Sequence, residues 1–204
     1  MSPSPQTALR IGAIVLAAGR SSRMAPRNKL LELAGKAPII VRVATAALAS
    51  KADPVIVVTG FEAHRIEQAL CDLQLRFVQN PAFAQRMSTS LRAGLSALPP
   101  DCDRALILLG DMPIVDVKVL DALIAAFTGP DAVCVPVFEG RRGNPVLWGR
   151  RYFAEILRLK GDTGAKQLLP RNTDRIIEVP VASQTILADV DTLADLARLG
   201  QTEK

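Results

Sequence analysis

Histidine, cysteine and aromatic residues are scarce in this sequence of 204 residues. The single histidine, His64, stands in a polar stretch without an acidic pair at ligand spacing, which disfavours a Ser–His–Asp triad. The three cysteines are widely spaced and form no C-x-x-C pair, so we expect small core residues in a reducing compartment rather than disulfides or a zinc site. Aromatic residues make up only 4% of the chain, so Ala, Leu, Val and Ile must build its core.

Long apolar runs and blocks of positive charge are also missing. No apolar run approaches the ~18 residues of a membrane span, and residues 1–10 hold no apolar segment of the kind found in signal peptides. We therefore expect a cytoplasmic protein that does not contact a membrane. The net charge is +5, but the arginines are spread along the chain rather than interleaved with aromatics. This pattern favours anionic small molecules over nucleic acid as partners.

Short apolar runs alternate with amphipathic segments along the chain. The apolar runs predict strands at residues 11–16, 55–60, 75–80, 105–109 (followed by a Gly-Asp turn at 110–113), 132–138, 175–179 and 185–188. The amphipathic segments predict helices at residues 38–50, 62–70, 86–98, 116–127, 151–159, 163–169 and 193–199. Such alternation is typical of an α/β fold with a mainly parallel, Rossmann-like sheet and helices on both faces. We expect a flexible tail at 1–10 and a single three-layer domain at 11–204, in which Pro136 marks an edge strand or a bulge.

Ligands of such a sheet bind beyond the carboxyl ends of its strands, which draws attention to the loop at residues 19–29. Gly19 lets the backbone pass close to a phosphate, and Ser21 and Ser22 add hydroxyl donors. Arg23 offers a planar fork for phosphate oxygens, and Lys29 a mobile charge for the α- and β-phosphates. The loop is neither a Walker loop nor G-x-G-x-x-G. The alternative is a solvated basic connection between a strand and a helix.

Carboxylates follow two later apolar segments. Asp111 comes directly after a buried strand, where it would either bind Mg²⁺ or cap the next helix. Asp189 and Asp191 would share one face if the chain stayed extended, but Asp191 or Thr192 would instead cap a helix that begins there. We choose Asp191 as the second metal ligand and keep Asp189 as the alternative.

Three further polar stretches are candidates for substrate contacts. The helix start at residues 87–91 would hold a base or ribose edge through its hydroxyls, or merely cap its helix. The turn at 142–145 would face a second substrate, or be an ordinary turn. The stretch at 161–165 reads as an ordinary helix start.

Six pieces in order along the chain carry a resemblance to a known family: LAAGRSSRM with NKLL, NPAFAQRMSTSL, GDMP, GRRGNPVL, GDTGAKQLL and DVDTLADL. Together they resemble the nucleotidyltransferases that mature molybdenum cofactor, within the larger group that includes sugar-nucleotide pyrophosphorylases. The resemblance covers residues 11–199 and is strongest to the molybdenum cofactor cytidylyltransferases. It implies a nucleotide-diphospho-sugar transferase-like fold.

The same resemblance implies a reaction and its partners. CMP would pass from CTP to the terminal phosphate of molybdopterin, with release of pyrophosphate. Mg²⁺ would be the cofactor, with Mn²⁺ as an alternative, and a molybdenum hydroxylase or its chaperone would receive the product. Two other functions stay open: a guanylyl- or sugar-nucleotide transferase of the same fold, and a non-catalytic protein that delivers the cofactor.

Site residues follow from the resemblance and from the loops identified above. The catalytic residues would be Lys29, Arg23 and Asp111, and the metal ligands Asp111 and Asp191. The residues expected to bind nucleotide are Leu16, Ala17, Ala18, Gly19, Arg20, Ser21, Ser22, Arg23, Lys29, Gly60, Asn80, Ser88, Ser90 and Asp111. Those expected to bind the second substrate are Met112, Pro113, Arg142, Gly143, Asn144, Pro145 and Gly164.

The expected preference for the base of the nucleotide depends on Ala18. By resemblance, family members with the motif LAAG use cytidine nucleotides, and those with LAGG use guanosine nucleotides. The methyl group of Ala18 would narrow the base pocket, which suits a one-ring pyrimidine. Shape alone discriminates by only ~1–3 kcal/mol. Two positions depart from the family pattern: Ala25, where glycine often follows Arg-Met, and Asn144, where histidine would be expected.

Overall fold

The computed structural model describes residues 10–162, 164–192 and 194–195, with the side chain of Arg23 excepted. Its strands are β1 (Arg10–Ala17), β2 (Leu33–Ala34), β3 (Ala37–Pro38), β4 (Val55–Thr59), β5 (Arg76–Gln79), β6 (Cys102–Leu109), β7 (Val133–Phe138), β8 (Arg141–Arg142), β9 (Val146–Gly149) and β10 (Ile176–Pro180). Within the described residues, eight of these strands form one sheet in the order β10-β7-β9-β6-β1-β4-β5, with β8 paired to β7. The β2 and β3 strands pair separately as a small hairpin.

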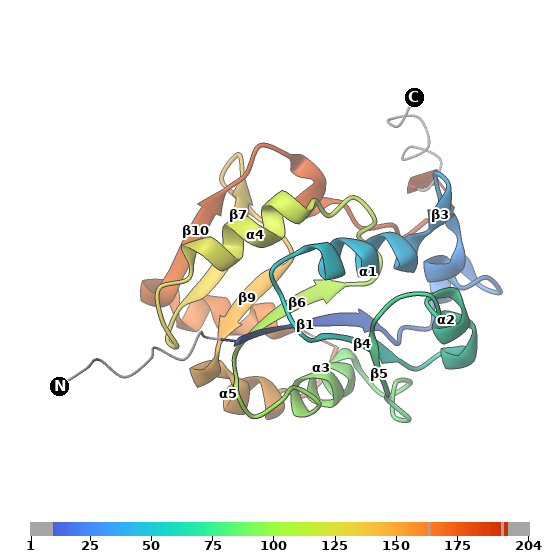
Figure 1. The fold of residues 1–204 in the computed structure, drawn as a ribbon, viewed down its shortest axis with the longest axis horizontal. Helices are drawn as coiled ribbons and strands as arrows, with labels where there is room; N and C mark the ends of the chain where they lie inside the picture. Colours follow the sequence, from blue (N-terminus) through green and yellow to red (C-terminus); the bar gives the residue numbers. More distant parts are fainter. Residues whose placement is uncertain (1–9, 163, 193, 196–204) are drawn as a thin grey trace.

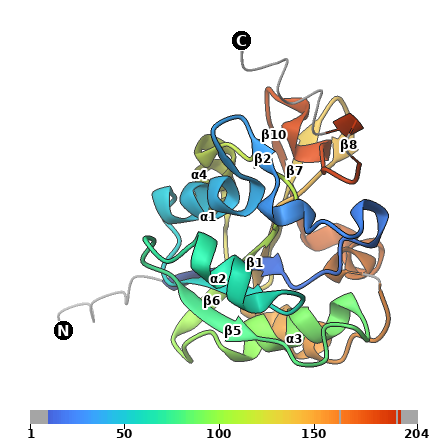
Figure 2. The ribbon, with the colours of Figure 1, turned by 90° about the vertical axis from the view of Figure 1, so that its right-hand side faces the viewer.

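Helices cover both faces of the sheet. The α-helices are α1 (Ile39–Ala49), α2 (Ala63–Ala69), α3 (Met87–Ser96), α4 (Val117–Ala126) and α5 (Phe153–Leu157). The α1 and α4 helices lie on one face, and α3 and α5 lie on the other (Figures 1 and 2). The expected α/β fold, a mainly parallel Rossmann-like sheet between two helix layers, is therefore confirmed. No helix among the described residues is long and apolar enough to cross a membrane.

The central strand β1 sets the position of the site. Its apolar run has no polar alternation because helices cover it on both sides. It pairs in parallel with β4 and with β6, so that Leu16 lies beside both Val58 and Leu109. The carboxyl ends of the three strands therefore stop at one level. Two hydrogen bonds join the chain at these strand ends. The N–H of Gly110, just after β6, donates to the carbonyl of Leu16 in β1 (3.0 Å), and the N–H of Phe61, after β4, donates to the carbonyl of Ala18 (3.2 Å).

Several expected elements differ in the structure. Residues 185–188 are not a strand: Gln184–Leu187 form a 3-10 helix, η6, because the hydroxyl of Ser183 accepts the N–H of Thr185 and starts a turn. The helix expected at 163–169 is replaced by 3-10 turns at Ala165–Arg171, η4. Thr163 and most of the helix expected at 193–199 lie outside the described residues.

Two smaller expectations are wrong in part. The strand that carries Pro136 is not at an edge, because β7 lies between β9 and β10. The proline is tolerated because it comes after the residues that pair with β9 and before Val137, where pairing with β8 begins. Among the cysteines, Cys102 and Cys134 are buried as expected, whereas Cys71 is exposed.

Gly94 shows how closely α3 approaches the sheet. A Cβ at this position would lie 2.5 Å from the Cγ2 of Ile14 and 2.8 Å from the Cγ2 of Val58. Both of those side chains are fully buried, so neither can move aside into solvent. The absence of a side chain at Gly94 thus sets the distance between α3 and the strands β1 and β4.

We predict that Gly94→Ala lowers the free energy of unfolding by about 1–3 kcal/mol through overpacking, although alanine favours the helix. Urea denaturation followed by the fluorescence of Trp148, the only tryptophan, measures the change. Gly129→Ala is the matched control, because no atom lies within 4 Å of the Cβ that it adds. Equal stability of the two variants would contradict this account of the packing.

Candidate active site

A cavity of about 520 Å³ opens beyond the carboxyl ends of β1 and β6. Eleven of the residues that line it were singled out from the sequence: Leu16, Ala18, Gly19, Arg20, Ser21, Ser22, Lys29, Ser90, Asp111, Asp189 and Asp191. The sequence reasoning did not name the other eight as site residues, although Met24, Met87 and Asp162 lie in stretches that it discussed. These eight are Met24, Leu30, Phe83, Ala84, Arg86, Met87, Leu109 and Asp162. The cavity therefore brings the first loop and the acidic residues of two distant segments together.

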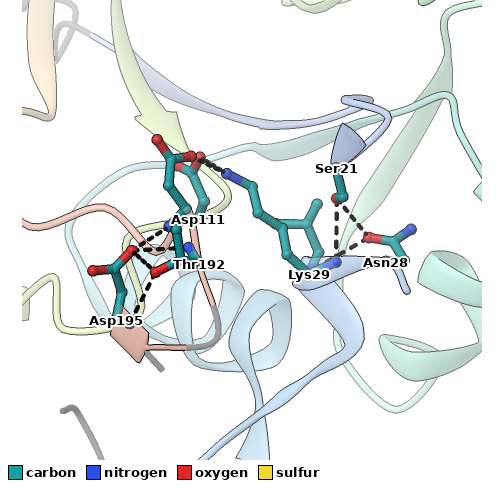
Figure 3. A network of polar contacts seen from close by, with 8 residues as sticks. Ser21, Asn28, Lys29, Asp111, Thr192 and Asp195 are labelled. Carbon is teal, nitrogen blue, oxygen red and sulfur yellow. Dashed lines mark hydrogen bonds and ion pairs between the residues drawn. The ribbon is translucent and has the colours of Figure 1, made fainter. Parts of the chain in front are cut away.

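The loop after β1 folds back on itself. Ser21 has a left-handed backbone (φ 52°), and its hydroxyl accepts the N–H of Lys29 at 3.1 Å. Asn28 is buried, and its side-chain oxygen accepts the N–H of Leu30 at 3.2 Å and lies 3.5 Å from the Ser21 hydroxyl (Figure 3). Ser21 thus fixes the point from which the Lys29 side chain extends. The side chain of Arg23, predicted to grip phosphate, lies outside the described part of the structure.

Lys29 contacts both predicted metal ligands. Its ammonium lies 2.6 Å from Oδ2 of Asp111 and 3.0 Å from Oδ1 of Asp191 (Figure 3). Its side chain is 15% exposed, and those of Asp111 and Asp191 are 22% and 36% exposed, so the three remain accessible from the cavity. Burial alone would lower the pKa of Lys29, but the Asp111 carboxylate and the hydrogen bonds to both aspartates outweigh it and raise that pKa.

The backbone fixes the two carboxylates relative to each other. The N–H of Val190 donates to the carbonyl of Asp111 at 2.9 Å, so the residues on either side of Val190 flank Asp111. The hydroxyl of Thr192 accepts the N–H of Asp195, whose carboxylate in turn accepts the N–H groups of Asp191 and Thr192. Thr192 therefore makes the capping contact, and the Asp191 carboxylate points to Lys29.

The carboxylate oxygens of Asp111 and Asp191 are suitable ligands for a hard divalent cation that also binds phosphate. Oδ1 of Asp111 is buried and has no hydrogen-bond partner among the described residues. Within the same residues, no three side chains of His, Cys, Asp or Glu gather to hold a metal ion. Two carboxylates without a third protein ligand match Mg²⁺ or Mn²⁺, which take their remaining ligands from water and substrate phosphates.

Ala18 and Phe83 line the cavity, and Gly60 packs against both without being part of the lining. A Cβ at Gly60 would lie 2.6 Å from the Cβ of Phe83 and 2.8 Å from the Cβ of Ala18, so these residues interlock. The guanidinium of Arg20 lies 5.6 Å from the centre of the Phe83 ring, within cation–π range. The sequence reasoning missed Phe83, although an aromatic residue in a polar loop of an aromatic-poor chain was an available signal.

Asn80 and Ser88 support the cavity wall but do not line the cavity. The buried Asn80 amide donates to the hydroxyls of Thr89 (2.8 Å) and Ser90 (3.0 Å), which ties the loop after β5 to the start of α3. The N–H of Ser88 donates to the carbonyl of Gly161. Of the other predicted nucleotide-binding residues, Ala17 is buried behind the cavity, whereas Ser90 reaches it.

The residues expected to bind a second substrate do not line this cavity. Met112 is buried, and the carbonyl of Pro113 accepts a hydrogen bond from Arg42. The exposed Arg142 pairs with Glu178 at 2.7 Å. The remaining four, which lie in the turn after β8 and in the loop before η4, are Gly143, Asn144, Pro145 and Gly164.

A further cation, Lys166, interacts with the charge of the cavity residue Asp189. The pKa of Lys166 is lowered by burial, and the charge of Asp189 opposes this effect only in part. The sequence reasoning did not consider Lys166, because a lone lysine in a polar stretch carries no signal of burial.

Solved structures share this fold over nearly the whole chain. A nucleotidyl transferase from Methanothermobacter thermautotroptrophicus is 27% identical with a TM-score of 0.84, and the match covers 95% of this chain and 97% of the other. Rv0371c from Mycobacterium tuberculosis H37Rv is 28% identical with a TM-score of 0.84, over 96% and 100%. A structure of the same mycobacterial protein in complex with manganese is 27% identical with a TM-score of 0.79, over 96% and 100%.

Curated relatives match over a smaller part of their length. The bifunctional protein GlmU of Francisella philomiragia is 31% identical over 144 residues, which are 70% of this chain and 30% of the relative. GlmU of a Psychrobacter species is 31% identical over 113 residues, 54% of this chain and 24% of the relative. The chain thus spans less than a third of either protein.

A family model described as the MobA-like NTP transferase domain matches residues 13–176, which include the first loop, Lys29 and Asp111. The match extends over most of the described sheet. This chain therefore belongs to the MobA-like NTP transferase family.

Proposed function

We propose that this nucleotidyltransferase moves CMP from CTP to the terminal phosphate of a molybdopterin-type cofactor. An oxygen of that phosphate attacks the α-phosphorus of CTP, the bond between this phosphorus and the α–β bridging oxygen breaks, and pyrophosphate leaves with the electron pair. The observation that carries the proposal is the contact of Lys29 with Asp111 and Asp191 at the floor of the cavity. Family membership supports the reaction class, and the ordered motifs support the two substrates.

The chain contributes mainly positioning and charge to this reaction. The loop after β1 presents backbone N–H groups and the Ser22 hydroxyl to the triphosphate, with Arg23 and Lys29 as its cations. Lys29, which extends into the cavity, would neutralise charge that develops on the leaving pyrophosphate. Asp111 and Asp191 would hold Mg²⁺, or Mn²⁺, which supplies further positive charge at the phosphates when bound. The manganese complex of the mycobacterial relative supports a divalent cation of this kind.

The apolar end of the cavity is proposed to take the base. Ala18 is buried against Gly60 and Phe83, so its methyl group limits the depth available to a base. A one-ring pyrimidine needs less depth than a purine, which favours CTP over GTP.

A sugar-nucleotide transferase is the second candidate, and the GlmU relatives favour it. Pyrophosphate release measured with CTP, GTP and UTP separates the candidates, each with molybdopterin and with a sugar phosphate as acceptor. Release with CTP that requires molybdopterin is expected. Release that requires a sugar phosphate would overturn the proposal in favour of the second candidate.

We predict that Asp111→Asn reduces pyrophosphate release from CTP by a factor on the order of 10²–10³, because a neutral amide neither balances Lys29 nor holds a divalent cation. Asp103→Asn, at the opposite end of β6, is the matched control and should keep the unaltered rate. Circular dichroism checks that both variants fold. Unchanged turnover in Asp111→Asn would rule out this site.

We predict that Ala18→Gly admits GTP and narrows the preference for CTP over GTP by roughly tenfold, within the range that shape discrimination allows. The ratio of kcat/KM for the two nucleotides measures it. Ala13→Gly is the control, because Ala13 is buried in β1, the strand that ends just before Ala18, and belongs to the core on the α1 and α4 face. A ratio that stays the same in Ala18→Gly would refute the base-pocket argument.

We predict that Lys29→Met binds bare Mn²⁺ more tightly than the unaltered chain, by about tenfold (1.4 kcal/mol), while it loses turnover. Without nucleotide, the ammonium competes with a metal ion for the same two carboxylates. Electron paramagnetic resonance of free Mn²⁺ measures the affinity. Lys36→Met, which removes an exposed lysine, should leave the affinity unchanged, and a weaker affinity in Lys29→Met would contradict the competition.

A further inference from the structure

The turn between β8 and β9 packs against η6 without space for a side chain. The N–H of Gly143 donates to the carbonyl of Pro136, and the N–H of Asn144 donates to the carbonyl of Ile186, both at 2.9 Å. A Cβ on Gly143 would lie 2.4 Å from the carbonyl oxygen of Ile186 and 2.7 Å from its Cβ and Cδ1. The nearest of these atoms belongs to the backbone, so an alanine at this position must move the η6 segment.

That segment leads directly to the acidic residues of the cavity. Ile186 and Val190 are both 2% exposed, so both anchor the segment in the core. The N–H of Val190 donates to the carbonyl of Asp111, and Asp191 follows with its carboxylate against Lys29. Only four residues separate Ile186 from Asp191, and the segment is held at both ends. A shift at Ile186 therefore reaches Asp191.

We infer that Gly143 is a positioning residue for the metal-binding carboxylate of Asp191, and that it acts through its contact with Ile186. This inference rests on the proposed function, in which Asp191 binds the metal. The sequence interpretation placed the turn against a second substrate, but Gly143 faces η6 and is not part of the cavity lining. The turn thus supports the cavity from behind.

Metal binding is more sensitive to such a shift than folding is. Mg²⁺ requires ligand distances of about 2.0–2.1 Å in near-ideal geometry, so a displacement of a few tenths of an ångström weakens it. Loss of groups that orient metal ligands typically costs 10–100-fold in affinity.

The test compares Gly143→Ala with the unaltered chain in Mn²⁺ titrations in the presence of CTP, followed by electron paramagnetic resonance. We expect the Mn²⁺ affinity to fall about tenfold. The Mn²⁺ concentration for half-maximal pyrophosphate release should rise in parallel, and the rate should recover at saturating metal. The KM for the acceptor, measured at saturating metal, should stay the same.

Two other glycines serve as controls. Gly129→Ala adds a methyl group into open space and should leave the Mn²⁺ affinity unchanged. Gly94→Ala strains the contact of α3 with the sheet, on the face opposite α1 and α4, and should also leave the Mn²⁺ affinity unchanged. It therefore separates a general loss of stability from a loss of ligand position. If Gly143→Ala does not fold, Ile186→Val replaces it, with an expected two- to threefold loss of affinity.

The outcomes are distinct. If Gly143→Ala binds Mn²⁺ with the same affinity as the unaltered chain, the inference is overturned and the proposed function stays intact. The same holds for Ile186→Val if that variant is used instead. A raised acceptor KM with unchanged Mn²⁺ affinity also overturns it, in favour of direct contact between the turn and the second substrate. If the unaltered chain binds no Mn²⁺ with CTP, the proposed function fails and the inference fails with it.

Discussion

The ammonium of Lys29 between the carboxylates of Asp111 and Asp191 is the interaction on which this site depends. Two carboxylates held near each other at the edge of an apolar sheet repel each other and are costly to desolvate. A cation between them reduces the repulsion and offsets part of the desolvation cost. Under the proposed function, a divalent ion that displaces Lys29 would serve both carboxylates, and the displaced ammonium would be available to the phosphates.

The parallel sheet makes that interaction possible. Lys29 lies 82 residues before Asp111 and 162 residues before Asp191, yet the shared register of β1 and β6 brings the segments together. Backbone hydrogen bonds from Val190 to Asp111 and from Gly110 to Leu16 also hold the arrangement in place. The chemistry of the cavity therefore follows from strand order more than from any local motif.

Much of this arrangement follows from the sequence, because buried strands and amphipathic helices have different periods and strand ends share an edge. That reasoning brought Lys29 and Asp111 to one cavity. The choice of Asp191 over Asp189 as metal ligand stays a prediction, which the contact of Asp191 with Lys29 supports. The reasoning failed where local hydrogen bonds determine the secondary structure: Ser183 starts a 3-10 turn in a segment whose composition suggests a strand. It also could not show that Gly143 faces Ile186, because a glycine in a polar turn looks the same with or without a tertiary neighbour.

The sequence separation of the three charged residues has a consequence for the protein during its synthesis. The loop at residues 19–29 and Asp111 emerge from the ribosome well before Asp191. Nascent chains acquire their N-terminal structure first. A chain that is interrupted before residue 191 still carries the loop and one carboxylate but lacks half of the charge balance. Under the proposed function, a nascent chain therefore acquires its complete metal site only after residue 191 has been synthesised.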